Sequence, residues 1–346
     1  MFEIAGLSLL AFTLSYLGVI GLRRWAERRQ ILDIPGERSS HTRPTPRGGG
    51  VAIVIICLIG LLIAWLLNPT WSLSTIITYL CIATFIATIS WLDDLYSLSN
   101  RVRLTAHSLA GILSVWGLGY WHSVYLPIWG ELDLSWLGVP VTFLWIVGLT
   151  NAYNFMDGID GIAGGQGVVA GLGWSISGLM SNDLLMASLG VMLAASCLGF
   201  LGHNWPPARI FMGDVGSAFL GYTFAIFPII VVQHDSRMAL VGILVVWPFV
   251  FDTFFTFFRR LRDGENVFKA HRSHLYQRLV IAGFTHRFVS LLYISLSLMG
   301  VILSLIWTQN IISSSFLISL AMLLLCVGLW SFVKYQERSK AMKQGC

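Results

Sequence analysis

Carboxylates at the edges of apolar runs are the side chains with the clearest chemical potential in this sequence. The segment NAYNFMDGIDGIAGG, residues 151–165, places two of them three residues apart between long apolar stretches. The acids that share this setting are Asp93, Asp94, Asp157, Asp160 and Asp214. An unpaired carboxylate in hydrocarbon is costly, and adjacent carboxylates repel unless they share a cation. We interpret the set as a site for a divalent metal ion and phosphate, with Asn154 as a further oxygen ligand of the kind that Mg²⁺ accepts.

A structural role at a helix end is the alternative for each acid. Aspartate often caps a helix N-terminus or interacts favourably with the helix dipole there. For Asp93 or Asp160 alone, the sequence does not separate this role from a functional one. Capping explains the Asp93-Asp94 pair less well, because we expect the pair at the C-terminal end of a helix, where the dipole disfavours anions.

Glycines and basic residues accompany these acids. Gly213 and Gly216 flank Asp214, and glycine lets backbone N–H groups approach an anion closely. The alternative for glycine is close helix packing, which is common in membranes. Cations are concentrated in two segments, PTPRGGG (44–50) and KAHRSHLYQR (269–278). Such segments are often solvated loops, but arginine and histidine also hold phosphate oxygens.

The elements that position these residues are predicted to be membrane-spanning helices. The chain has 346 residues, of which 56% are hydrophobic and 11% charged, and its mean hydropathy is +0.74. Soluble domains carry about 25% charged residues, and apolar runs of about 18 or more residues recur along this chain. We therefore predict an all-α polytopic membrane protein that forms a single domain over residues 1–346. Eleven spans are expected, at residues 4–22, 51–67, 73–91, 104–121, 136–152, 161–179, 184–202, 216–233, 239–258, 288–306 and 311–333.

The distribution of basic residues predicts the orientation. Arginines follow the first apolar run, which is not the order of a cleavable signal peptide and places the N-terminus outside. Alternating spans then put all but one of the 22 Lys and Arg residues on the cytoplasmic side, Arg237 being the exception. The C-terminus is cytoplasmic, and so are loops at residues 23–50, 92–103, 153–160, 203–215 and 259–287. The net charge of +5 is thus an orientation signal and does not indicate nucleic acid as a partner.

Five motifs in order resemble the polyprenyl-phosphate N-acetylhexosamine-1-phosphate transferase family. They follow PTPRGGG and are WLDDLYSLSNRVRL, NAYNFMDGIDGIAGG, NWPPARIFMGDVGSAFLG, WPFVFDTFFTFFRR and HRSHLYQRL. The resemblance extends over residues 33–280. The expected number of eleven spans also resembles that of the bacterial branch of glycosyltransferase family 4. This branch starts O-antigen, common-antigen and teichoic-acid chains at the inner membrane.

The resemblance implies catalytic and metal-binding roles for the acids. Asp93 and Asp94 match a paired acidic motif that engages the lipid phosphate, and Asp157 and Asp160 match a second acidic motif. In the same way, Asn154 and Asp214 match the ligands of Mg²⁺, for which Mn²⁺ is an alternative.

The resemblance also implies a set of substrate-binding residues. Phe211 matches an aromatic residue that stacks on uracil, although from the residues alone it is a packing residue in a hydrophobic loop. The segment 271–278 matches a loop that contacts pyrophosphate and helps to select the sugar. The full implied set is Arg47, Arg103, Asn151, Phe211, His271, Arg272, His274 and Arg278.

The implied reaction transfers an N-acetylhexosamine 1-phosphate from a UDP-sugar to undecaprenyl phosphate and releases UMP. Membrane lipids are the expected surroundings, and a homodimer is left open. Tyr276 and Gln277 stand where many members have histidines, and His107 stands where many have glutamine. Both departures are similar to a sub-branch that uses 6-deoxy sugars such as N-acetylfucosamine or N-acetylquinovosamine, with N-acetylglucosamine as the other option. A triple histidine typical of the peptidoglycan translocase is absent from this motif.

Two alternatives stay open from the sequence. A polytopic chain with acids near its spans could be a secondary transporter or lipid flippase, although transporters place charged sites near the midplane, often within inverted repeats. Asp252 lies seven residues before Arg259, about 10 Å inside the cytoplasmic edge at about 1.5 Å per residue. It is either a motif residue of the family or a hydrogen-bonding residue between helices.

Overall fold

The computed structural model describes residues 2–36, 43–233, 235–267, 271–309 and 314–344, and these form an all-α polytopic membrane protein. The helices are α1 (Phe2–Arg29), α2 (Gly50–Leu67), α3 (Leu73–Tyr96), α4 (Asn100–Leu118), α5 (Gly138–Met156), α6 (Ile162–Met180), α7 (Leu184–Asn204), α8 (Asp214–Val232), α9 (Met238–Val245), α10 (Trp247–Arg262), α11 (Leu275–Ala282), α12 (His286–Thr308) and α13 (Ser314–Gln344). A single 3₁₀ turn, Ser135–Leu137, precedes α5.

Capping residues in the sequence set where several helices begin. Ser72 accepts a hydrogen bond from the backbone N–H of Thr75, and Ser99 accepts one from Val102. Asp183 caps α7 in the same way through the N–H of Met186. Polar turns between apolar runs therefore convert directly into helix boundaries.

The predicted spans overlap with these helices. Among the described residues, eight helices are long and apolar enough to cross a membrane, or nine if the bent pair α9–α10 counts as one span. Helices α4 and α6 lie at two further predicted spans without meeting that measure. The number of eleven spans and the orientation therefore stay predictions.

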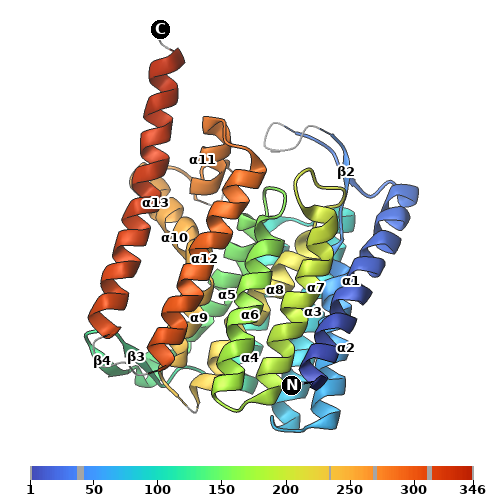
Figure 1. Ribbon diagram of the computed structural model, residues 1–346, viewed down its shortest axis with the longest axis vertical. Coiled ribbons are helices and arrows are strands. Elements are labelled where there is room, and N and C mark those ends of the chain that lie inside the picture. Colours follow the sequence, from blue (N-terminus) through green and yellow to red (C-terminus); the bar gives the residue numbers. More distant parts are fainter. Residues whose placement is uncertain (1, 37–42, 234, 268–270, 310–313, 345–346) are drawn as a thin grey trace.

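Helix α8 lies at the centre of the bundle, packed against α3, α5 and α2, and almost all of its residues are buried. Around it, α6 packs on α7 and α1 packs on the other side of α7. Helices α1 and α13 lie at opposite edges of the molecule, and the N- and C-termini lie at opposite ends (Figure 1). The core thus holds α8 with its first residue, Asp214, at one end of the bundle.

The span predicted at residues 239–258 is not one straight helix. It consists of α9 and α10, which meet at an angle of 77°. Pro248 in the first turn of α10 has no N–H to continue the hydrogen-bond ladder of α9. The indole N–H of Trp247 donates to the Leu296 carbonyl of α12 at 2.8 Å and fixes the break in the core.

Short elements outside the bundle were not expected from the sequence. Strands β1 (Leu32–Asp33) and β2 (Thr45–Pro46) pair antiparallel at the end of the molecule that also holds α11 (Figure 1). Strands β3 (Ser123–Leu126) and β4 (Gly130–Asp133) form an antiparallel hairpin at the opposite end, with Ser123 opposite Asp133. Helix α11 lies within the segment 259–287 that was predicted as a loop.

Candidate active site

The N-terminus of α8 is built around Asp94. The Oδ1 atom of Asp94 accepts a hydrogen bond from the backbone N–H of Asp214 at 3.0 Å, and its Oδ2 atom accepts one from Val215 at 3.1 Å. Gly213 has φ +78°, and a Cβ there would lie 2.5 Å from Asp94 Oδ2, so glycine is required at this approach. Capping, which we judged a weaker explanation for the aspartate pair, does apply to Asp94. The carboxylate lies at the C-terminal end of its own helix but caps the N-terminus of another, where an anion is favoured.

Asp93 points to a different partner. Its Oδ2 atom lies 3.2 Å from Nη1 of Arg103, and the same Nη1 lies 3.1 Å from Oδ2 of Asp214. The Oδ1 atom of Asp93 accepts a hydrogen bond from the Leu98 N–H at 2.5 Å. Arg103 is thus the cation that two of the predicted carboxylates share. The structure brings Asp93, Asp94 and Asp214 together through this arginine and the start of α8.

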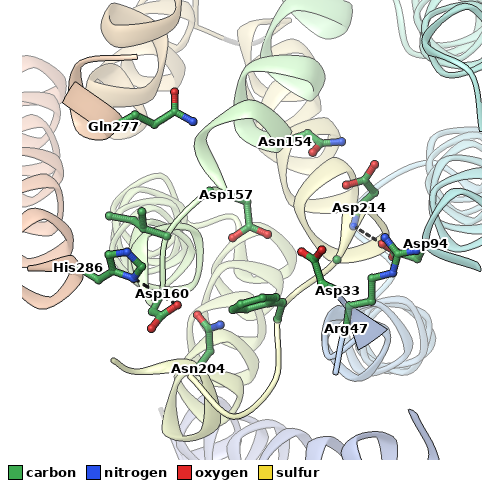
Figure 2. A pocket seen from close by; sticks show the side chains of 14 residues that line it. Asp33, Arg47, Asp94, Asn154, Asp157, Asp160, Asn204, Asp214, Gln277 and His286 are labelled. Atoms are coloured by element: carbon green, nitrogen blue, oxygen red, sulfur yellow. Dashed lines mark hydrogen bonds and ion pairs between the residues drawn. The ribbon is translucent and has the colours of Figure 1, made fainter. Parts of the chain in front are cut away.

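A cavity of about 230 Å³ opens beside this cluster. Seven of the sequence-predicted site residues line it: Arg47, Asp94, Asn154, Asp157, Asp160, Phe211 and Asp214. Figure 2 shows Asn154, Asp157 and Asp214 on the walls of one space, with Asp160 on one side and Arg47 on the other. Segments that are far apart in sequence therefore converge on one acidic cavity.

Asp157 follows the last residue of α5 and faces this space. Its carboxylate makes no hydrogen bond or ion pair with another residue drawn in Figure 2. Burial, and then the carboxylates of Asp214, Asp94 and Asp160, raise the pKa of the Asp157 carboxyl well above its usual range. A cation placed among these carboxylates would reverse that effect.

Asp160 holds neighbouring segments in place. Its Oδ2 atom accepts a hydrogen bond from the Ala208 N–H at 3.0 Å, and its Oδ1 atom lies 3.4 Å from Nδ1 of His286 at the start of α12. Its backbone carbonyl also accepts a hydrogen bond from Ser290 Oγ at 2.8 Å. The two acids of the second motif therefore differ, because Asp160 is engaged by the protein and Asp157 faces the cavity.

The loop between α7 and α8 is fastened to its surroundings at both ends. Asn204 Oδ1 accepts the Gly161 N–H at 2.9 Å, and its Nδ2 donates to the Ile210 carbonyl at 2.9 Å. The Phe211 N–H donates to the Pro46 carbonyl at 2.8 Å, and the Gly49 N–H donates to the Phe211 carbonyl at 2.9 Å. These bonds bring Phe211 beside the glycine segment that begins α2.

Arg47 and the three glycines after it play different parts. Arg47 lines the cavity, and its buried Nε atom has no hydrogen-bond partner among the residues that the structure describes. The glycines serve packing, because a Cβ on Gly48 would lie 2.4 Å from the Trp91 ring and one on Gly50 would lie 2.4 Å from the Gly216 Cα. Gly216 accordingly has the close-packing role that the sequence offered as the alternative to anion binding.

The segment 271–278 lies beside the cavity. Four residues of this segment were predicted to bind substrate, and none of them lines the cavity. They are His271, Arg272, His274 and Arg278. His271 accepts a hydrogen bond at Nδ1 from Ser273 Oγ at 2.9 Å, with the ring in the tautomer that leaves this nitrogen free. Burial, and then the charges of His274 and Arg260, lower the pKa of the His271 ring to about 4. Arg278 forms a bidentate ion pair with Glu337 of α13.

Asp252 fixes the start of α11. This buried carboxylate accepts hydrogen bonds from the backbone N–H groups of Leu275 at 2.7 Å and Tyr276 at 3.0 Å. It also accepts one from the Tyr293 hydroxyl of α12 at 2.6 Å and lies 3.3 Å from Nδ1 of His274. Of the two roles considered for Asp252, the structure shows the hydrogen-bonding one.

Asn151, an implied substrate-binding residue, and His107, a departure from the family pattern, contact each other and do not line the cavity. Asn151 Oδ1 lies 3.1 Å from Nδ1 of His107, and the Asn151 amide donates to the Val147 carbonyl at 2.7 Å. His107 stands on α4 and Asn151 on α5, so the pair joins these helices one turn before Asn154. Asn151 thus has a structural contact in addition to its implied role.

The donor set fits a magnesium ion. Among the residues that the structure describes, no group of three or more His, Cys, Asp or Glu side chains is arranged to hold a metal ion. Mg²⁺ does not need such a group, because it is usually bound through one or two carboxylates together with substrate phosphates and water. Asp157, Asp214 and Asn154 present oxygen donors of this kind to one cavity.

Some lining residues were missed in the sequence: Asp33, Ile159, Asn204, Gln277 and His286. Asn204 and Asp33 lie in or near the recognised segments, but no periodicity or repeat distinguishes them. His286 and Gln277 reach the cavity only because α11 and α12 fold back over the start of α6. A polar residue at a helix start on the side predicted to be cytoplasmic was the one available signal for His286.

Comparison with known proteins gives consistent matches. The profile of Glycosyl transferase family 4 matches residues 75–232. The chain is 33% identical over 286 residues to a probable undecaprenyl-phosphate N-acetylglucosaminyl 1-phosphate transferase of Bacillus subtilis (strain 168), covering 80% of this chain and 78% of the relative. It is 31% identical over 322 residues to a decaprenyl-phosphate N-acetylglucosaminephosphotransferase of Mycobacterium leprae (strain TN), covering 84% and 80%. It is also 34% identical over 223 residues to a phospho-N-acetylmuramoyl-pentapeptide-transferase of Synechococcus sp. (strain JA-3-3Ab), covering 59% and 61%.

The fold and the cavity define a multi-pass membrane protein whose polar site is enclosed by helix ends and the loops between them. The chain belongs to Glycosyl transferase family 4, the polyprenyl-phosphate hexosamine-1-phosphate transferases.

Proposed function

We propose that this protein transfers an N-acetylhexosamine 1-phosphate from a UDP-sugar to undecaprenyl phosphate and releases UMP. The observation that carries the proposal is the convergence of Asn154, Asp157 and Asp214 on one cavity that Arg47, with its buried Nε atom, also lines. Two phosphate-bearing substrates must approach each other in this reaction, and their charge requires cations in a site shielded from water. Two relatives, each aligned with at least 80% of this chain, are named as transferases of this kind.

The chain's own residues account for the binding steps. Asn154 and Asp214 would hold Mg²⁺, which neutralises charge on the donor diphosphate when bound. Arg47, whose Nε has no hydrogen-bond partner within the described part of the chain, is placed to hold a phosphate oxygen. An oxygen of the polyprenyl phosphate attacks the β-phosphorus of the donor, the bond from that phosphorus to the α-phosphate oxygen breaks, and UMP leaves. Phe211, at the cavity wall, is the proposed surface for uracil.

The place of the cavity suits one soluble and one membrane-bound substrate. It lies where α3 and α5 end and where α8 begins, so the apolar helices stand on one side of it and the charged loops on the other. We assign this end of the bundle to the cytoplasmic face of a bacterial inner membrane. That assignment is supported by the basic residues, which cluster in the loops at the same end.

The sugar is the finer part of the proposal. Gln277, one of the departures from the common histidine motif, lines the cavity, whereas Tyr276 is buried and donates its hydroxyl to the Phe155 carbonyl at 3.0 Å. Gln277 is therefore the proposed contact to the sugar. We propose N-acetylglucosamine or a 6-deoxy-N-acetylhexosamine as the transferred group, and an O-antigen-type cell-surface glycan as the product that the reaction starts.

The test is a reaction of purified protein with undecaprenyl phosphate, Mg²⁺ and a panel of UDP-N-acetyl sugars, measured by UMP release and lipid-linked product. Asp214→Asn is expected to lower kcat by about 10²–10³-fold, since it removes a charged group at the reacting phosphates. Asp263→Asn, at an exposed acid directly after α10, should stay within about two-fold of the parent. Absence of product with every sugar, or equal losses in both variants, would overturn the proposal.

A further inference from the structure

A second cavity lies on the far side of α10, between α10 and α13. Its volume is about 720 Å³, which is within the usual range of about 300–1,000 Å³ for small-molecule sites. It shares no lining residue with the acidic cavity. Its lining residues are Phe251, Phe254, Phe255, Phe258, Arg259, Arg262, Arg278, Trp330, Lys334, Glu337 and Arg338, and we call it the α10–α13 groove.

The groove exists because both helices depart from the bundle. The 77° bend turns α10 outward, and Phe254 and Phe258 are left 59% and 57% exposed. Helix α13 has 31 residues and is about 46 Å long at about 1.5 Å per residue, so it extends past a hydrocarbon core of about 30 Å. Figure 1 shows it at the edge of the molecule, extending beyond α11.

Apolar and charged side chains are separated along the groove. The aromatic residues of α10 come before its last turn, and Arg259 and Arg262 occupy that last turn. On α13 the order is the same, with Trp330 followed by Lys334 and Arg338. The groove therefore has an aromatic floor at the level of the acyl chains and a basic rim at the boundary.

Basic side chains at the rim of the groove outnumber acidic ones. Among the described lining residues there are five cations and one carboxylate, Glu337, and that carboxylate is already held by Arg278. Lys334 lies 4.9 Å from the centre of the Trp330 ring, which keeps its ammonium group at the rim. Basic pockets of this kind at the cytoplasmic boundary attract anionic lipid head groups.

We propose that the α10–α13 groove binds one anionic phospholipid, with its phosphodiester at the basic rim and an acyl chain on the aromatic floor. The occupant is a resident lipid and not the acceptor substrate, because α11 separates the two cavities. Gln277 faces the acidic cavity and the next residue, Arg278, faces the groove. Because the two sets of lining residues do not overlap, a phosphate at the rim would contact neither Asp157 nor Asp214.

A lipid in this groove would stabilise the position of α11, which lies between the two cavities. Arg278 ties α11 to Glu337 of α13, and the Lys340 ammonium of α13 donates to the Ile281 carbonyl of α11. Arg259 of α10 donates to the Ser273 carbonyl at 2.9 Å. The head group would neutralise the mutual repulsion of cations that these contacts bring together.

The test titrates phosphatidylglycerol into the full chain in detergent and measures bound lipid by native mass spectrometry. The groove variant is Arg262→Gln/Lys334→Gln/Arg338→Gln. The matched control is Arg24→Gln/Arg28→Gln/Arg29→Gln, three exposed cations on the last turns of α1. A cation at the surface contributes about 1 kcal/mol to anionic-lipid binding, so the groove variant should bind on the order of 10²-fold more weakly.

Further arms separate the sources of the phosphate and do not depend on transferase activity. Inorganic phosphate and phosphatidylcholine should not displace bound phosphatidylglycerol, and Asp214→Asn should bind it as the parent does. Unchanged affinity in the groove variant, or an equal loss in the α1 control, would overturn the proposal. Displacement by undecaprenyl phosphate at equal concentration would make the groove an acceptor site, and a dimer that excludes the lipid would make it a subunit interface. Equal thermal unfolding of the two lipid-free variants shows that both are folded.

Discussion

Aspartates that look alike in the sequence have different partners in the fold. Asp94 gives both carboxylate oxygens to the backbone of α8, Asp93 is paired with Arg103, and Asp160 is paired with His286. Asp157 alone among these four faces the cavity without a partner drawn in Figure 2. The environment of each carboxylate, more than its place in a motif, therefore decides which experiment is informative.

Asp94 is expected to position Asp214 and not to act as a base. In Asp94→Asn an amide N–H₂ replaces one oxygen and faces a backbone N–H, which costs about 1–3 kcal/mol of stability for a buried unsatisfied donor. The second pKa of a phosphate monoester is about 6, so the acceptor is already largely ionised at neutral pH. The loss of kcat should therefore persist from about pH 6 to pH 8.5 in a pH–rate profile. Full recovery at the upper end would identify Asp94 as a general base, a role that contributes about 10²–10⁴-fold.

Asp157 is expected to couple magnesium binding to proton release. Its raised pKa means that the carboxyl keeps its proton to a higher pH than an ordinary aspartate when no metal is bound, whereas metal binding requires the carboxylate. Apparent Mg²⁺ affinity should then rise as pH increases through the pKa of Asp157. Calorimetric titration in two buffers of different ionisation enthalpy measures the proton count directly. Asp157→Asn should release fewer protons, and an unchanged count would contradict this assignment.

At the scale of elements, a buried clamp joins three helices. Asp252 of α10 binds two backbone N–H groups at the start of α11 and the hydroxyl of Tyr293 on α12. Because α11 carries Gln277 into the cavity wall, the clamp sets the position of a residue that the sequence did not single out as a ligand. Element geometry and site composition are therefore linked at this point.

Loosening this clamp should expose the start of α11. Tyr293→Phe removes one hydrogen bond to a charged group, worth about 1.5–3 kcal/mol, and Asp252→Asn should cost more because several donors lose a charged acceptor. Hydrogen exchange at the Leu275 and Tyr276 amides should accelerate in both variants. Tyr96→Phe is the matched control, because Tyr96 is 72% exposed on α3. Unchanged exchange in Asp252→Asn would mean that other contacts hold α11.

Hydropathy predicted the helices well because burial in lipid demands long apolar segments. It did not predict the break before Trp247, since Val245–Trp247 is as apolar as its neighbours and only Pro248 signals an interruption. Of the fourteen site residues that the motif positions implied, seven line the cavity, because their loops extend from helix ends on one face. Asp33, Asn204 and His286 were missed because their approach depends on tertiary packing, which no local pattern encodes.

At the scale of the whole molecule, the two ends of the bundle differ in both structure and charge. The acidic cavity, α11 and strand β2 lie at the end that also carries the C-terminus, and the β3–β4 hairpin lies at the other (Figure 1). Arg237, the one basic residue expected outside, is near the hairpin end, because the Tyr125 N–H donates to the Ser236 carbonyl at 3.1 Å. The predicted orientation can therefore be tested at few positions.

Cysteine labelling in intact cells is the direct measurement of orientation. In a background with the native cysteines replaced, Ser72→Cys at the outer end of α3 should react with an impermeant thiol reagent. Ser99→Cys and Ser273→Cys, at the cavity end, should react only after the membrane is opened. Asn310, another outer position expected from the sequence, lies outside the described residues. Labelling of Ser273→Cys in intact cells would place the cavity outside and refute the cytoplasmic assignment.

The bend between α9 and α10 also bears on the order in which the nascent chain can settle in the membrane. Helix α9 has eight residues, about 12 Å at about 1.5 Å per residue, and cannot cross a hydrocarbon core of about 30 Å by itself. Its junction with α10 is secured by Trp247 on the Leu296 carbonyl and by Asp252 on Tyr293, and both partners belong to α12. Residues 238–262 are therefore expected to reach their final position only after α12 has been synthesised. During biogenesis, a later segment of the chain fixes an earlier one.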